Sequence, residues 1–192
     1  MGLSGLKNCG LTPGAKTKLR IAPLSDFNGW PQTRAEVVLA AAGIPAQGDT
    51  MILDEPFDFS TAPTGEGYWR EYDIVVDSGD LTASLQGEPG AGQSFQNQLP
   101  FYLSGTSAER LEFANTIKNC CEGFAAMIVD KDDTHYVIGE PGLPVFPVTI
   151  EVGLGKASGD KKGGDYVLQQ SSGTTFKIYD AATHGVDVTP NA

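Results

Sequence analysis

The chain has 192 residues, of which 40% are hydrophobic, and this size and composition fit one globular domain with a core of its own. Its 24 acidic and 13 basic side chains give a formal net charge of −11. An acidic surface repels nucleic-acid phosphates and anionic membranes, and no apolar run reaches the roughly 18 residues of a membrane-spanning helix. The composition therefore argues against a nucleic-acid-binding protein and against a helical membrane protein.

Glycine and proline interrupt the chain throughout, with 24 and 12 residues scattered between short apolar runs. This pattern predicts many turns and many short strands, and hence a mainly β domain. The three cysteines, Cys9, Cys120 and Cys121, are odd in number and include no C-x-x-C pair. They indicate a reducing compartment, and they suggest neither zinc nor thioredoxin-like chemistry.

The first part of the chain, residues 1–49, is predicted to be an extended arm packed on or beside the domain, because prolines and glycines break its apolar runs. Residues 19–22 are a strand candidate within this arm. Residues 33–42 fit a short helix with Thr33 and Glu36 as a capping box. The β-branched pair that follows Glu36 fits a strand equally well, so both alternatives stay open.

The main domain is predicted to span residues 50–180, with strands placed by short apolar runs and by period-two alternation. The strand candidates are residues 51–53, 57–59, 68–76, 81–85, 94–103 and 148–152. A turn at 78–80 separates the third candidate from the fourth, and Pro100 weakens the fifth as an inner strand. The pattern also predicts a closing hairpin of 166–170 with 174–179, and a peripheral tail at 181–192.

A helix followed by a hairpin is the most clearly patterned segment. The helix is predicted over 107–119, with Thr106 and Glu109 as a capping box and apolar residues at helical spacing. The hairpin joins 124–130 to 134–139 through a turn rich in aspartate. The predicted fold class is therefore mainly β, a β-sandwich or β-barrel flanked by one α-helix.

Nothing in the sequence is arranged for catalysis, and no cofactor or metal site is predicted. Only two histidines occur, His135 and His184, and neither a G-x-S-x-G nor a G-x-x-x-x-G-K-[ST] motif is present. Two acidic groups lack the spacing of a calcium loop and are interpreted as solvated turns: Asp130, Asp132 and Asp133, and Asp54, Glu55 and Asp58. The chain is therefore predicted not to be an enzyme.

Three segments carry a resemblance to a known family, namely residues 107–119, 126–133 and 155–165. Through them the chain resembles the tail tube (major tail) proteins of long-tailed phages over residues 68–180, and residues 1–60 lie outside the resemblance. The resemblance implies a structural virion protein with a tail-tube-like β fold. It also implies assembly into stacked, usually hexameric rings around a channel through which DNA is ejected.

On this interpretation the partners are copies of the chain, other tail proteins, and DNA that passes without specific binding; no membrane is involved. The protein would be made in the host cytoplasm and end in the phage tail. Acidic charge would let DNA slide by repulsion, and open sheet edges would pair across subunits. The candidate subunit-contact loop is rich in turn residues: Gly87, Glu88, Pro89, Gly90, Ala91 and Gly92.

Two alternatives belong to other classes. One is another virion component, such as a capsid decoration or tail terminator protein. The other is a carbohydrate-binding module with an aromatic platform, although no polar cluster accompanies the rings and a β core needs as many. The rings in question are Trp30, Trp69, Phe95, Phe101 and Tyr102.

Overall fold

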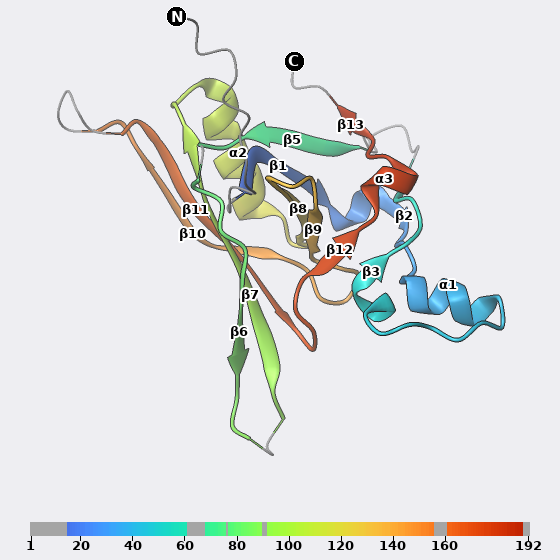
Figure 1. Cartoon of the computed structure of the whole chain (residues 1–192). Coiled ribbons are helices and arrows are strands. Elements are labelled where there is room, and N and C mark those ends of the chain that lie inside the picture. The colour runs from blue at the N-terminus through green and yellow to red at the C-terminus, as the bar shows by residue number, and fades with distance from the viewer. Residues whose placement is uncertain (1–14, 61–67, 76, 90–91, 156–160, 190–192) are drawn as a thin grey trace, which may run out of the picture.

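The computed structural model describes residues 15–60, 68–75, 77–89, 92–155 and 161–189, which form a mainly β fold with three sheets (Figure 1). The predicted mainly β class is confirmed. The two larger sheets pack over a shared core in the manner of a sandwich, and none of the sheets built by the described strands closes into a barrel. Within the described ranges, every helix is too short or too polar to cross a membrane.

The largest sheet has seven strands in the order β13-β5-β1-β8-β9-β12-β3. The outermost strands, β13 and β3, run parallel to their neighbours, and the other pairs are antiparallel. The bounds are Val188–Thr189 for β13, Trp69–Asp73 for β5, Ala15–Pro23 for β1, Phe124–Asp130 for β8, His135–Ile138 for β9, Lys177–Tyr179 for β12 and Ile52–Leu53 for β3.

A four-stranded antiparallel sheet, called the small sheet below, has the order β10-β11-β7-β6. Its strands are β6 (Thr82–Gln86), β7 (Ser94–Ser104), β10 (Phe146–Gly153) and β11 (Gly163–Ser172). Figure 1 shows that its two hairpins, β6–β7 and β10–β11, project past the rest of the molecule in different directions. A third sheet pairs only β2 (Phe27–Gly29) with β4 (Asp58–Phe59).

The first described strand, β1, lies inside the largest sheet rather than beside the domain. It pairs with β5 on one side and with β8 on the other. Leu19, Ile21 and Ala22 are buried because they face the cores on the two sides of this sheet. The predicted division between an arm at 1–49 and a domain from residue 50 therefore does not describe this strand. Similarly, the predicted tail contains α3 (Ala181–His184) and the sheet strand β13.

Two helices form at the segments where the sequence predicts a capping box. Residues Arg34–Ala40 form helix α1, and the predicted capping box is present because Thr33 accepts from the Glu36 amide while Glu36 accepts from the Thr33 amide. Helix α2 spans Ala108–Asn119, but its N-cap is Ser107 and not Thr106. The Ser107 hydroxyl accepts from the Arg110 amide, which satisfies one of the free donors of the first turn.

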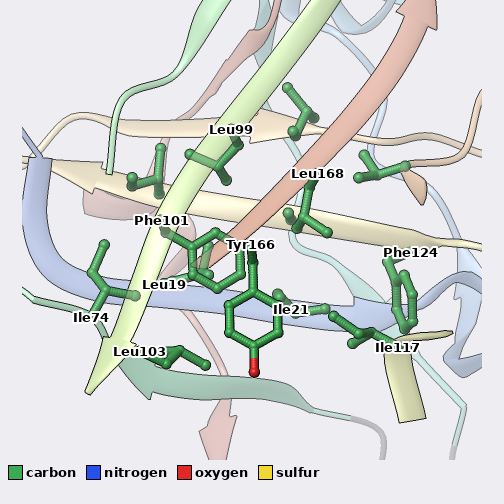
Figure 2. Packing of buried hydrophobic residues seen from close by; sticks show 14 of the residues in the cluster. Leu19, Ile21, Ile74, Leu99, Phe101, Leu103, Ile117, Phe124, Tyr166 and Leu168 are labelled. Atoms are coloured by element: carbon green, nitrogen blue, oxygen red, sulfur yellow. The ribbon is translucent and has the colours of Figure 1, made fainter. Parts of the chain in front are cut away.

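Between the largest sheet and the small sheet lies the main core, formed by side chains that alternate along each strand. Figure 2 shows Leu19 and Ile21 of β1 facing Leu99, Phe101, Tyr166 and Leu168 of the small sheet. The Phe101 and Tyr166 rings stack at 5.2 Å. Helix α2 closes one flank, since its Phe113 ring lies 4.5 Å from that of Tyr72 in β5 and 5.4 Å from that of Tyr166.

A second core covers the opposite face of the largest sheet. Trp69, Phe57, Leu53 and Tyr179 pack there with Met127, and the third sheet adds partly buried rings. Because β8 contacts a core on each face, six of its seven residues, from Phe124 to Val129, are buried. This explains why its sequence is a continuous apolar run and lacks the alternation of a half-exposed strand.

One predicted hairpin is wrong. Residues 163–172 belong to β11 in the small sheet, whereas 177–179 belong to β12 in the largest sheet, so the chain crosses between sheets at this point. The predicted turn at 78–80 likewise separates strands of different sheets, β5 and β6. Pro100 is tolerated inside β7 because β6 ends opposite Gln98, so no strand needs the missing donor on that side.

Candidate functional site

Counting only the strands of the described ranges, the small sheet has an open edge on each side, because β10 and β6 each have one paired neighbour. Strand β10 carries exposed apolar side chains along its length: Phe146 is 42% exposed, Val148 52% and Val152 40%. On β6, Leu85 is 53% exposed. Edges with free backbone groups and apolar side chains are templates for pairing with another chain. These edges are therefore the strongest candidate for a binding surface in the described part of the molecule.

The outward side of the small sheet, here called the polar face, carries mainly polar side chains, whereas the core side carries mainly apolar ones. In β7, Asn97, Leu99 and Phe101 are buried, while the alternating residues Gln96 and Gln98 are only partly buried. Gln98 donates to the Gln169 side chain across the β7–β11 pair at 3.2 Å. By the strand registers, the polar face also carries Thr82, Ser84, Gln86, Thr149, Glu151, Asp165 and Ser171, together with the less polar Phe146, Val167, Pro100 and Tyr102.

No lysine, arginine or histidine occurs within the bounds of the four strands of the small sheet. The largest sheet differs, since β1 and β5 alone contain Lys18, Arg20 and Arg70. A basic group does lie close to one end of this face, since the Lys161 Nζ is 5.5 Å from the centre of the Tyr102 ring at the end of β7. The polar face is thus neutral or acidic over the length of its strands.

Two carboxylates lie directly opposite each other on the polar face. Glu151 of β10 is the cross-strand partner of Asp165 in β11, and both are exposed. Like charges in this arrangement destabilise a sheet by a few tenths of a kcal/mol up to about 1 kcal/mol. The stability of the single chain therefore does not explain why these two carboxylates face each other. We interpret them as part of the chemistry that the polar face presents to its surroundings.

The candidate contact loop lies at the tip of the β6–β7 hairpin, which forms the lower end of the molecule in Figure 1. Its described residues Gly87, Glu88, Pro89 and Gly92 are all exposed, and Gly90 and Ala91 lie outside the described residues. Gly87 has φ +97, and a Cβ there would come within 2.6 Å of the Gly92 carbonyl oxygen. Glycine is therefore required at 87 to close the turn.

The acidic turn joins β8 to β9 as predicted. Asp130 is partly buried and its carboxylate accepts from the Lys131 amide at 2.6 Å, while Asp132 and Asp133 are exposed. The Asp133 amide donates to the Asp130 carbonyl, and Asp133 has φ +68. Among the described residues, no group of three or more His, Cys, Asp or Glu side chains is placed to hold a metal ion.

Asp54 belongs to an ion-pair network that ties three segments together. The Arg34 guanidinium donates to Asp54 at 2.9 Å and to Asp180 at 2.9 Å, and His184 lies 3.3 Å from Asp54. Hydrogen bonds from Arg34 hold the pKa of Asp54 below its usual range, burial opposes this, and His184 adds to it. Glu55 instead accepts from the Gln32 amide at 3.0 Å. This network fastens α1 and α3 to β3.

We expect this network to make part of the stability sensitive to acid. Since the pKa of Asp54 is lowered by folding, its contribution is full above the ordinary carboxyl pKa of about 4 and is lost as the pH falls through the lowered value. Asp54→Asn should reduce the free energy of unfolding by about 1 kcal/mol at neutral pH. Urea denaturation at several pH values should show this difference shrinking toward low pH, and Glu55→Gln should not reproduce it.

The remaining chemically interesting side chains do not converge. His135 Nδ1 lies 3.0 Å from the Asp133 carbonyl oxygen, whereas His184 is in the Asp54 network. Cys120 packs against the main core, and Cys121 is exposed. The five rings considered as a sugar platform do not share a surface, because Trp69 lies in the second core and Phe101 in the main core.

The sequence contains the signal for the polar face, although it does not reveal that the four strands belong together. The sequence shows that these segments lack basic residues, but its pattern predicts the wrong partner for β11 and no partner for β6. Comparison of the chain with protein-family models, with curated proteins and with solved structures gives no match. Any function must therefore be argued from the residues and the fold.

Proposed function

We propose that this chain is a structural protein that assembles with copies of itself into stacked rings and forms a tube for DNA, as in a phage tail. The observation that carries the proposal is the small sheet, which combines two open edges with a polar face free of basic residues along its strands. The open edges with exposed apolar side chains are a liability in an isolated subunit.

The open edges support assembly. Strand β10 of one copy and β6 of the next have the unpaired backbone groups needed to continue a sheet across the subunit boundary. Because the two edges are different surfaces, the contact is head to tail, and such contacts close into rings when the rotation permits. Exposed Val148 and Val152 on β10 and Leu85 on β6 would be covered by this pairing.

The polar face supports a role as a channel lining. Sheets joined edge to edge around a ring expose one face to the lumen, and the opposite face of this sheet is committed to the main core. Along its strands this face carries mostly glutamine, serine and threonine with the carboxylates Glu151 and Asp165. No cation within the strand bounds could hold phosphates, and Lys161 lies just before the start of β11. DNA would pass along such a surface without being retained.

The direct test is the state of the purified chain. We expect rings or tubes with a central channel in negative-stain electron microscopy, and fast-sedimenting species in analytical ultracentrifugation. Single rings that never stack would favour a tail terminator protein or a decoration protein instead. A strictly monomeric chain at high concentration would contradict self-assembly altogether.

A further inference from the structure

A cavity opens beside the main core, between the 79–81 loop, strands β8 and β9 of the largest sheet, and the residue before β12. Its volume is about 270 Å³, and it is lined by Gly79, Asp80, Leu81, Ile128, Asp130, Tyr136 and Phe176. None of these residues belongs to α2, to the strands of the small sheet's outer edges, or to the Asp54 network. The cavity is just below the range of about 300–1,000 Å³ that is typical of ligand sites, so it suits a small ligand.

The walls of the cavity are apolar and aromatic. Ile128 is 3% exposed, and Leu81, Tyr136 and Phe176 pack against the main core while remaining partly exposed. The Tyr136 and Phe176 rings meet edge to face at 5.3 Å. Aromatic rings attract cations over their faces, with energies of about 0.5–2 kcal/mol, while the aliphatic walls favour an apolar ligand body.

The polar groups of the cavity are negatively charged. Asp80 and Asp130 contribute carboxylates, and Asp132 lies on the same turn as Asp130. Burial raises the pKa of Tyr136, and the negative charges of Asp130 and Asp132 raise it further. The neighbouring cation, Lys131, is engaged at 2.7 Å by Asp77. The cavity therefore combines an aromatic pair with two aspartates among its lining residues.

We propose that this cavity is a binding site for a small organic cation, an ammonium group carried on an apolar or aromatic body. The apolar body would pack on Leu81 and Ile128, and the ammonium would lie near the carboxylates of Asp80 and Asp130 with the Tyr136 ring beside it. This inference does not depend on the proposed assembly, because all of the lining residues belong to one chain.

Three probes of nearly equal size and different charge test the site: phenethylammonium, neutral phenethyl alcohol, and the anion hydrocinnamate. Amide NMR spectra of the full chain should show saturable shifts at Gly79, Leu81 and Ile128 with phenethylammonium. The alcohol should bind up to about fivefold more weakly, and the anion should not bind. Equal binding of cation and alcohol, or no saturable shifts with the cation, would overturn the proposal.

Matched variants locate the charge that matters. Asp80→Asn should weaken phenethylammonium binding up to about fivefold and leave the affinity for the alcohol unchanged. Asp132→Asn is the comparison: its carboxylate acts on Tyr136 but does not line the cavity, so its removal should weaken phenethylammonium binding less than Asp80→Asn does. Leu81→Trp, once its amide spectrum shows a folded chain, should fill the cavity and abolish binding of both ligands. Retained binding in Leu81→Trp would also overturn the assignment.

Discussion

Replacing Val148 and Val152 together with lysine is expected to abolish assembly while leaving the subunit folded. Both side chains lie on the β10 edge and are 52% and 40% exposed, so lysine is accommodated in the monomer. In the assembled ring the same positions would be covered, and each unpaired ammonium would cost several kcal/mol. Because about 1.4 kcal/mol is a factor of ten, the concentration needed for assembly should rise by at least ~100-fold. Sedimentation velocity measures this directly.

A control variant distinguishes the loss of the β10 edge from the effect of the two added positive charges. Leu39→Lys combined with Ile44→Lys also replaces two exposed apolar residues, which are 60% and 94% exposed and lie in or just after α1. This pair should assemble like the original chain, and circular dichroism should show both variants folded. If the β10 variant still forms rings, or if only the α1 variant loses them, the contact does not use the small-sheet edge.

The second large effect is expected at Trp69. This side chain is fully buried in β5 and packs edge-to-face on Phe57 with ring centres 5.0 Å apart, and also contacts Phe27 and Phe59. Trp69→Ala should lower the free energy of unfolding by about 3–5 kcal/mol, a large part of the 5–15 kcal/mol that a domain possesses. Chemical denaturation followed by circular dichroism measures the loss.

Trp69→Phe distinguishes lost packing from a lost polar contact. Among the described residues the buried indole Nε1 has no hydrogen-bond partner, so its removal breaks no bond to them and removes an unsatisfied donor. Phenylalanine keeps most of the aromatic contact and should cost much less than alanine. A loss in Trp69→Phe as large as that in Trp69→Ala would mean that the indole nitrogen is bonded in solution and that packing is not the main term.

The local elements could be predicted from sequence because their causes are local. The capping box at Thr33 and Glu36 and the alternation in β7 rest on neighbouring residues alone. Strand partners could not be predicted in the same way. Serine and glycine at 171–173 indicate that the chain turns, but a turn does not specify whether the next strand pairs back or crosses to another sheet. For this reason the sequence pattern predicts one hairpin where β11 and β12 belong to different sheets.

The candidate surface depended on the same missing information. Glu151 and Asp165 are opposite only because β10 and β11 pair in a particular register, with an irregularity at Pro147 to Thr149. The cavity at Tyr136 combines residues from four separate segments, and no single segment shows it. The place of β1 was equally hidden, since its partners lie about 50 and 100 residues further along the chain.

The central position of β1 also fixes the order in which the protein can be completed during synthesis. Its neighbours β5 and β8 end at residues 73 and 130. Strand β3 can pair only after β12, residues 177–179, has been made. Pairings between such distant segments form slowly, and none can form before the later strand has left the ribosome. The small sheet likewise needs β11 to join its two hairpins. A growing chain therefore keeps unpaired strands in both larger sheets until β11 and β12 have emerged.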